Sequence, residues 1–298
     1  MHDGTTWTVR IGENLGPYRI EGLPGAGGMG RVYLAQDNEL CRTVAINVVD
    51  HARKDPQSLR SRLREARLAA SLSHPSICSV HKVGHVGDEP FIVMEHVRGL
   101  SLATLLHRMG ALPIETAVHY EKQIVDAVAH AHDHEIVHGD LKTSNLMVDP
   151  DGRLKILDFG LAVRRVVERT DEADLDTTVI APPSSCAGTV PYMAPELLRG
   201  READVHSDIW AMGVVLFEML AGFRPFCGAT SFELAARILS NEPVPFSALV
   251  PQAFRDIIER CLVTCPTERY QTAHDLASAL DQALWQWQSF EGVAGCEV

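Results

Sequence analysis

A glycine-rich segment near the start of the chain could hold phosphate groups. Residues 25–32 read Gly-Ala-Gly-Gly-Met-Gly-Arg-Val, with Gly25, Gly27, Gly28 and Gly30 as the glycines. Glycine has no side chain to keep backbone N–H groups away from a polyphosphate. The segment is not followed by a helix pattern and lacks the Gly-Lys-Ser/Thr ending of a P-loop, which disfavours both dinucleotide-binding and P-loop folds. On its own, the pattern also fits a glycine-rich hairpin.

A second segment combines an acid, an amine and an amide in one loop. Residues 138–145 read His-Gly-Asp-Leu-Lys-Thr-Ser-Asn and contain Asp140, Lys142 and Asn145 directly after a helical pattern. Asp158-Phe159-Gly160 follows two short strand patterns, and Ala194-Pro195-Glu196 comes later. This ordered set is far more specific than the glycine pattern.

The ordered set resembles the signature motifs of the protein kinase family. The resemblance runs from about Tyr18 to about Leu284, most of the chain. Lys142 and the segment 188–192 (Gly-Thr-Val-Pro-Tyr) are typical of serine/threonine kinases. The sequences Gly-Gly-Met-Gly-Arg-Val-Tyr and Pro-Tyr-Met-Ala-Pro-Glu are similar to those of bacterial members. The resemblance implies a two-lobed fold and an ATP-dependent phosphotransferase.

The resemblance also implies a role for each polar residue. Asp140 would accept or orient the proton of the attacking hydroxyl, because phosphoryl transfer depends on positioning more than on a strong base. Lys142 would neutralise the moving γ-phosphoryl group. Asn145 and Asp158 would hold Mg²⁺ through hard oxygen ligands. Asp208 would brace the loop from within.

The same resemblance implies the walls of a nucleotide pocket and one structural ion pair. The backbones of Glu95 and Val97 would bond the adenine edge, and Glu196 would pair with Arg269 inside the helical lobe. The remaining wall residues would be Gly25, Gly27, Gly28 and Gly30 over the phosphates, Val32 and Ala45 above adenine, Leu146 below it and Met94 at the back.

The chain departs from the family pattern after Val44-Ala45-Ile46, where lysine is usual and this chain has Asn47. That lysine normally bonds the nucleotide phosphates and pairs with a helix glutamate, which aligns here with Glu65. Asparagine is shorter and uncharged, so neither contact can form as a charge pair. Losing one preorganised charge-stabilising donor costs about 10²–10³ in rate. We therefore predict a slow enzyme, with two alternatives open. Asn47 marks a natural pseudokinase or an engineered inactive mutant, or another cation takes the place of the lysine, Arg31 being nearest in sequence.

A second departure is Gly139, where many kinases have the arginine that receives a phosphorylated activation-loop residue. Its absence predicts that phosphorylation of the loop 161–193 matters less for activation. Thr177 or Thr178 is hypothesised to be modified, with unmodified solvated hydroxyls as the equal alternative.

The elements that must position these residues fall into two groups. Strand patterns occupy 18–24, 31–37, 42–49, 80–86 and 91–96, with one helix near 57–72. Helical patterns then dominate 114–134, 206–221, 231–239, 252–262 and 272–287, with short strands at 145–148 and 154–157. We predict an α+β fold of two lobes with a ligand cleft between them. The expected divisions are an extension (1–17), an N-lobe (18–96), a C-lobe (97–284) and a tail (285–298).

Composition narrows the partners. The 298 residues carry a formal net charge of -12, which disfavours nucleic acid and anionic membrane as partners. The seven cysteines are scattered without a CxxC pair, which favours reduced thiols in a cytoplasm. The apolar stretch 210–223 is too short to span a bilayer, so a membrane segment is not expected.

The sequence therefore predicts a serine/threonine protein kinase that uses ATP and Mg²⁺ on protein substrates and is impaired by Asn47. The alternative is a pseudokinase that acts as a nucleotide-binding signalling module. A small-molecule phosphotransferase is disfavoured by Ala194-Pro195-Glu196 and by the helices after it. The substrate and the oligomeric state are not readable from the sequence.

Overall fold

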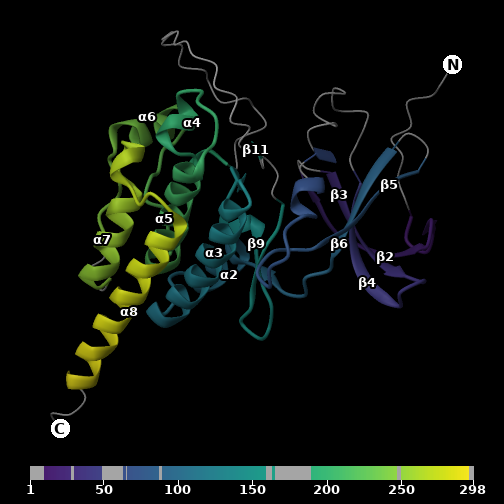
Figure 1. The fold of residues 1–298 in the computed structure, drawn as a ribbon, viewed down its shortest axis with the longest axis horizontal. Helices are drawn as coiled ribbons and strands as arrows, with labels where there is room; N and C mark the ends of the chain where they lie inside the picture. Colours follow the sequence, from purple (N-terminus) through teal and green to yellow (C-terminus); the bar gives the residue numbers. More distant parts are fainter. Residues whose placement is uncertain are drawn as a thin grey trace.

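The N-lobe is built on one antiparallel sheet. The computed structural model of the protein describes residues 10–27, 30–48, 63–64, 66–86, 89–158, 163–164, 189–246 and 250–294. Within them, the sheet has the order β1-β2-β3-β4-β6-β5 and every neighbouring pair is antiparallel (Figure 1). The strands are β1 (Asn14–Leu15), β2 (Tyr18–Gly27), β3 (Gly30–Asp37), β4 (Arg42–Val48), β5 (Val80–Val86) and β6 (Glu89–Glu95).

The central strand β4 is buried on both of its faces. Successive side chains of a strand point to opposite sides of the sheet. Val44, Ile46 and Val48 join the hydrophobic core of the N-lobe. Ala45 and Asn47 point to the other face and are also buried. A polar residue therefore sits in a strand whose surroundings favour apolar ones.

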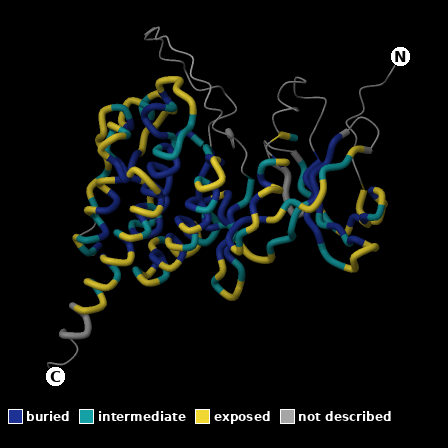
Figure 2. The backbone as a smooth tube through the Cα atoms, in the orientation of Figure 1, coloured by how far each residue is buried: buried dark blue, intermediate teal, exposed yellow. Residues whose placement is uncertain are grey.

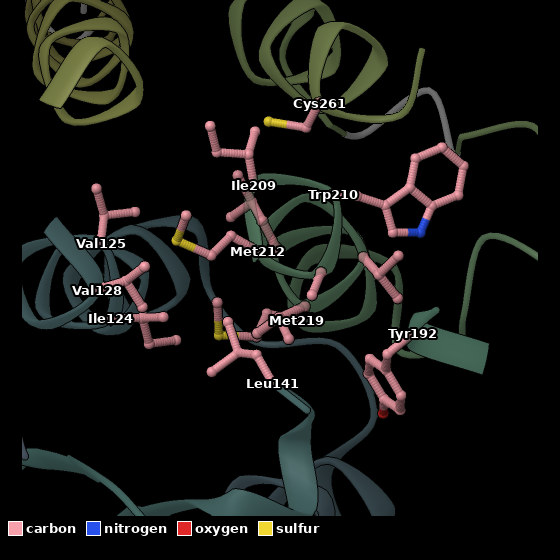
Figure 3. Close-up of a cluster of buried hydrophobic side chains, with 14 of the residues drawn as sticks. Ile124, Val125, Val128, Leu141, Tyr192, Ile209, Trp210, Met212, Met219 and Cys261 are labelled. Carbon is pink, nitrogen blue, oxygen red and sulfur yellow. The ribbon is translucent and has the colours of Figure 1, made fainter. Parts of the chain in front are cut away.

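The C-lobe packs its helices around α5 (Val205–Ala221), which lies inside the helical half of Figure 1. From Ser207 to Leu220 every residue of α5 except Glu218 is buried, and a helix that is apolar all round belongs in a core. Figure 2 shows this buried centre inside an exposed shell, and Figure 3 shows Ile209, Met212 and Met219 facing α3. The other helices are α2 (Leu102–Met109), α3 (Ile114–Asp133), α4 (Pro195–Leu198), α6 (Ser231–Ser240), α7 (Gln252–Cys261) and α8 (Ala273–Ala294).

Both ends of α5 are fixed by local signals in the sequence. Asp204 caps the N-terminus by accepting from the backbone N–H groups of His206 and Ser207, and the Ser207 hydroxyl oxygen accepts from the backbone N–H of Asp204. Gly222 ends the helix at a φ of 78°, a left-handed conformation that favours glycine. The backbone of Ala111 lies so close to Gly222 that a Cβ atom would approach it within 2.7 Å.

Several short strands lie in the first part of the C-lobe. β7 (Leu100–Ser101), β9 (Leu146–Val148) and β10 (Leu154–Ile156) form one small sheet, and β8 (Ile136–Val137) pairs with β11 (Val163–Arg164). Residues 138–145, which we call the Asp140 loop, lie between β8 and β9 and include the 3₁₀ turn Thr143–Asn145. A bridge between Ile77 and Ile156 joins the two lobes next to this loop.

The predicted two-lobed α+β fold is confirmed, and the described strands and helices follow the predicted ranges closely. The sequence analysis missed α2, although Ser101 caps it and Gly110 ends it. Most of the helix predicted at 57–72 lies outside the described residues. The divisions at 17, 96 and 284 stay predictions, although α8 continues through residue 284 to Ala294. In the part of the chain that the structure describes, no helix is both long and apolar enough to cross a membrane.

Candidate active site

Strand register gathers the predicted upper wall of the nucleotide pocket on one face of the sheet. Val32 pairs with Asn47 across β3 and β4, and Ala45 pairs with Met94 across β4 and β6. Directly paired residues in an antiparallel sheet project to the same face. Val32, Ala45, Asn47 and Met94 therefore share the face opposite the N-lobe core.

Asn47 lies on this face without a partner for its oxygen. The residue is 6% exposed, and among the described residues its Oδ1 accepts no hydrogen bond. Arg31 is paired with Val48, so the register places it on the opposite face from Asn47. This geometry speaks against Arg31 as a substitute for the missing lysine. Glu65, the expected partner of that lysine, lies outside the described residues.

The glycine-rich segment forms the hairpin between β2 and β3. Gly25 is in register with Val32 and Gly27 with Gly30, and the pairing shifts between Gly22 and Gly25. The segment is thus strand, turn and strand without a helix, which fits a phosphate-covering hairpin and not a dinucleotide fold. Gly28 lies outside the described residues.

The strand β6 ends at the expected adenine-binding residues and is tied to both lobes. The Glu95 carboxylate accepts from the Lys155 ammonium group at 2.8 Å and from the Ser79 backbone N–H at 3.3 Å. Val97 follows in the half-buried connection to β7. The adenine contacts of the Glu95 and Val97 backbones stay predictions.

Leu146, the predicted lower wall of the pocket, and its neighbour Met147 differ in burial. Leu146 is fully buried and belongs to the C-lobe core. Met147 points to the other face of β9 and is half-buried. Leu146 was predicted from its position in the motif. Its burial distinguishes it from Met147, whose side chain is partly accessible. The contact with adenine stays a prediction for either residue.

The three polar residues of the Asp140 loop come together as one buried cluster. The Lys142 ammonium group lies 2.7 Å from Asp140 Oδ2. The Asn145 amide nitrogen donates to the Asp140 backbone oxygen at 3.0 Å and approaches Asp140 Oδ2 at 3.4 Å. All three residues are at most 9% exposed. Their spacing in the sequence is converted into direct contact by the tight turn at 143–145.

One oxygen of Asp140 is left open by this cluster. Lys142 and Asn145 both approach Oδ2, while Oδ1 is buried and has no hydrogen-bond partner among the described residues. A buried carboxylate oxygen without a partner is costly unless a ligand completes it. Asp140 is therefore arranged to accept one further hydrogen bond, as a group that receives the proton of a hydroxyl must be.

The loop is held from below by Asp208 on α5. Asp208 Oδ2 accepts from the His138 backbone N–H at 2.8 Å and contacts His132 Nε2 at 2.9 Å, and Oδ1 accepts from the Gly139 N–H at 2.8 Å. Burial alone would raise the pKa of Asp208, but these hydrogen bonds and the charges of His132 and His138 hold it below its ordinary value. Gly139 has a φ of 73°, a left-handed conformation that favours glycine there.

The residues predicted to bind magnesium suit that ion. The Asn145 amide nitrogen is occupied by Asp140, which leaves the amide oxygen for a metal. Asp158 is half-buried in a left-handed conformation at a φ of 46°. No cluster of three or more His, Cys, Asp or Glu within the described ranges could hold a metal alone. Mg²⁺ usually binds one or two carboxylates together with substrate phosphates, so a fully formed protein cage is not required.

The Asp140 loop makes two side-chain hydrogen bonds to residues 189–192, which we call the 189–192 segment. Neither hydrogen bond was predicted from the sequence. The Lys142 ammonium group donates to the Thr189 hydroxyl at 2.9 Å. The Thr143 hydroxyl lies 2.7 Å from the Tyr192 hydroxyl, and Tyr192 donates to Glu218 Oε2 at 2.5 Å. The only sequence signal was the presence of hydroxyl residues next to a motif lysine, which does not predict partners 47 to 49 positions away.

The predicted structural ion pair is present in the C-lobe. Arg269 donates to both oxygens of Glu196, at 2.7 and 2.8 Å, and its side chain is fully buried. Its remaining donors reach the backbone oxygens of Val263, His206 and Thr264. A bidentate pair with every donor used is the form of buried ion pair that a core tolerates.

A bilobal fold with a glycine hairpin in one lobe and a buried Asp–Lys–Asn cluster in the other defines the class of the protein. The family model "Protein kinase domain" matches residues 18–280, so the chain belongs to the protein kinase family. The predictions at Glu65, Gly28, Thr177 and Thr178 lie outside the described residues and are not located by the structure.

Similar curated proteins are bacterial serine/threonine-protein kinases. The chain is 38% identical to PrkC of Bacillus subtilis (strain 168) over 92% of its own length and 42% of that protein. It is 36% identical to PknA of Mycobacterium tuberculosis (strain H37Rv) over 91% of its own length and 62% of that protein. It is 34% identical to PknB of Mycobacterium leprae (strain TN) over 88% of its own length and 42% of that protein. The chain thus spans 42% to 62% of the length of these relatives. The chain is a protein kinase domain of the bacterial serine/threonine type.

Proposed function

We propose that the chain transfers the γ-phosphoryl group of ATP to serine or threonine hydroxyls of proteins, at a rate lowered by Asn47. The observation that carries the proposal is the buried Asp140–Lys142–Asn145 cluster with one open carboxylate oxygen. A pseudokinase under no selection for transfer would not need to retain this arrangement. The names of PrkC, PknA and PknB support serine/threonine acceptors.

The residues of the Asp140 loop have separate tasks in this reaction. Bound MgATP supplies the phosphoryl group and part of the positive charge that stabilises it. Asp140 Oδ1 accepts the proton of the attacking hydroxyl as the new P–O bond forms and the bond to ADP breaks. Lys142 holds Asp140 Oδ2 and brings positive charge to the transferred group. Asn145 and Asp158 would hold Mg²⁺.

Asn47 limits the rate because it offers no charge where the family has lysine. Its amide is buried on the nucleotide-facing side of β4 and its oxygen is without a partner among the described residues. A neutral amide offers phosphate oxygens no positive charge, while an ammonium group would bind them as an ion. The expected cost is about 10²–10³ in rate.

The free thiols of Cys41, Cys78, Cys227, Cys261 and Cys265 support a reducing, cytoplasmic location for this domain.

A second candidate is a pseudokinase that binds nucleotide and acts as a signalling module. The observation that favours it is the same one, the uncharged Asn47 with its unpartnered oxygen. The two candidates differ only in whether the Asp140 cluster is used for transfer.

Label incorporation from γ-labelled ATP with Mg²⁺ separates them. The natural chain, Asn47→Lys, Asp140→Asn and the double variant would be assayed on the protein itself and on mixed histones. We expect slow transfer by the natural chain, a gain of about 10²–10³ in Asn47→Lys and loss in both Asp140→Asn proteins. Silence of all four, with a melting temperature that still rises on adding MgATP, would instead establish the binding module.

A further inference from the structure

The Asp140 loop and the 189–192 segment are joined by two neighbouring side chains. Lys142 reaches Thr189, and Thr143 reaches Tyr192. Lys142 is also bonded to Asp140, so its contact belongs to the reacting cluster itself. Among the described residues, the Thr143 hydroxyl makes no hydrogen bond to Asp140. Thr143 is 2% exposed, and its hydroxyl contacts the side chains of Tyr192 and Glu218 instead.

The direction of the Thr143 bond follows from the proton of Tyr192. The Tyr192 hydroxyl has one proton, and it is given to Glu218 Oε2 at 2.5 Å. The 2.7 Å contact between Thr143 and Tyr192 must then be filled by the proton of Thr143. The Thr143 hydroxyl also lies within 3.4 Å of Glu218 Oε2, so Tyr192 at 2.7 Å is the nearer of its two acceptors. The result is a chain in which Thr143 donates to Tyr192 and Tyr192 donates to the carboxylate. A side chain without a hydroxyl at position 143 would leave the buried Tyr192 oxygen without its donor.

Glu218 connects this chain of hydrogen bonds to helix α5 and so fixes the position of Tyr192 and Thr143. Glu218 lies on α5 ten residues after Asp208, which holds the backbone of His138 and Gly139. Ten residues of helix span about 15 Å. Helix α5 therefore holds the Asp140 loop at two separated points. Asp208 binds the loop backbone directly, and Glu218, ten residues later, binds it through Tyr192 and Thr143. Figure 3 shows the Tyr192 ring at the edge of the core with its hydroxyl pointing away from it.

The segment that Thr143 holds lies against the reacting carboxylate. Asp140, Thr189 and Tyr192 line the same small cavity beside the loop. We expect the acceptor hydroxyl to approach Asp140 along this edge and the nucleotide to lie on the other side, under β3 and β4. A displacement of the 189–192 segment should therefore change how the acceptor hydroxyl is presented and leave the nucleotide contacts in place.

We propose that Thr143 is a positioning residue that holds the 189–192 segment in register with Asp140 and so sets the efficiency with which the protein acceptor is used. This inference rests on the proposed kinase function. It adds a residue whose side chain contacts neither the reacting carboxylate nor the nucleotide-facing strands among the described residues.

The test compares Thr143→Val, which keeps the shape and removes the donor, with Thr143→Ser, which restores the donor. Both would be made in the Asn47→Lys protein so that rates are measurable, with Asp140→Asn as the inactive reference. Thr143→Val is expected to lower kcat/KM for mixed histones about tenfold, the equivalent of one lost buried hydrogen bond. The KM for ATP should change less than twofold, and Thr143→Ser should recover most of the loss.

Two further variants separate positioning from general damage. Tyr192→Phe should lower histone kcat/KM to a similar extent, and the double variant should be no worse than either single one, since the residues act through one chain. Thr272→Val removes a hydroxyl bond to Asp275 at the start of α8, remote from the site, and should leave both kinetic constants unchanged. Equal losses for ATP and histone, or additive losses in the double variant, would overturn the proposal.

Amide hydrogen exchange provides an arm that does not need activity. Thr143→Val should speed exchange in 189–192 while 138–140, held by Asp208, keeps its protection. Unchanged protection in 189–192 would refute the coupling even if the chain proves to be a pseudokinase. Silence of the Asn47→Lys parent together with the expected exchange result would refute the kinase reading of the natural chain and retain the coupling.

Discussion

The C-lobe side and the N-lobe side of the active site differ in how their buried polar groups are hydrogen-bonded. On the C-lobe side, Asp208 accepts two backbone hydrogen bonds from the Asp140 loop and contacts His132 on α3, and Lys142 and Asn145 share one oxygen of Asp140. On the N-lobe side, Asn47 is equally buried but its oxygen has no partner in the described chain. The comparison shows that the polar groups around Asp140 are paired with one another, whereas the buried oxygen of Asn47 is not.

The largest effect should come from removing the anchor of the C-lobe side. Asp208→Ala leaves His132 and two backbone N–H groups buried without an acceptor, so we expect a loss of about 3–5 kcal/mol in the free energy of unfolding. A urea titration of both proteins measures this difference. A loss below about 1 kcal/mol would mean that the loop is held by packing instead.

The pH dependence of this anchor can be derived from the lowered pKa of Asp208. A carboxylate with a lowered folded pKa stabilises above its unfolded value, and the stabilisation is lost as pH falls through the folded value. The difference between the natural chain and Asp208→Asn should therefore be full near pH 7 and shrink below about pH 4. A difference that grows on acidification would contradict the assignment.

A buried acid without partners should show the opposite sign. Glu121 on α3 is fully buried, and neither carboxylate oxygen has a hydrogen-bond partner among the described residues. Burial raises its pKa well above the ordinary value of 4.5. Glu121→Met removes an unsatisfied polar group with little change of shape, so we expect a gain of about 1–3 kcal/mol in the free energy of unfolding at pH 7.

The same variant has a distinct pH signature. An acid whose folded pKa is raised contributes most below the unfolded value, and the contribution is lost as pH rises through the folded pKa. The advantage of Glu121→Met should thus be smallest near pH 4.5 and increase towards pH 8. Urea midpoints at several pH values measure it, with Glu115→Met on the same helix as the control. An advantage independent of pH would show that Glu121 is not a titrating group in this range.

A smaller gain is expected on the N-lobe side. Asn47→Leu replaces the buried amide by an apolar group of similar size, which should stabilise the nucleotide-free protein by about 1 kcal/mol. Thermal unfolding without nucleotide measures it, and Ala45→Val on the same strand face serves as the packing control. Destabilisation by Asn47→Leu with Ala45→Val unchanged would mean that the amide has a partner after all.

The smallest effect should come from a charge pair in water. Arg237 lies 3.1 Å from Glu233, four residues earlier on α6, and both side chains are more than 40% exposed. Arg237→Gln should cost only about 0.3–0.5 kcal/mol, and less at high salt. A urea titration at low and at high salt tests this baseline, against which the three buried groups are judged. A larger cost would undermine burial as the basis of the comparison.

The fold was largely predictable because its local signals agree. The alternation in β3, β4 and β6 and the all-apolar stretch of α5 match the elements observed. Helix α2 was missed because its eight residues are too few for a strong periodic pattern. Residue type alone also does not separate Trp285, which is 70% exposed, from Trp287, which packs on the C-lobe core. Their positions on one helix differ by two residues and hence by more than half a turn.

The sequence by itself identified the residues of the site. The order of the motifs and the residue types at Asp140, Lys142, Asn145 and Asn47 can be read without knowing any distance in space. The partners were decided only by the tertiary structure. His130, His132, His134 and His138 form one cluster in the sequence, yet His132 contacts Asp208, His138 lies within the Asp140 loop and His130 makes a tilted ring contact with His134. The Thr143–Tyr192–Glu218 chain likewise joins segments 26 to 75 residues apart. A hydrogen bond depends on the last few tenths of an ångström between two atoms, and only the packed core fixes that distance.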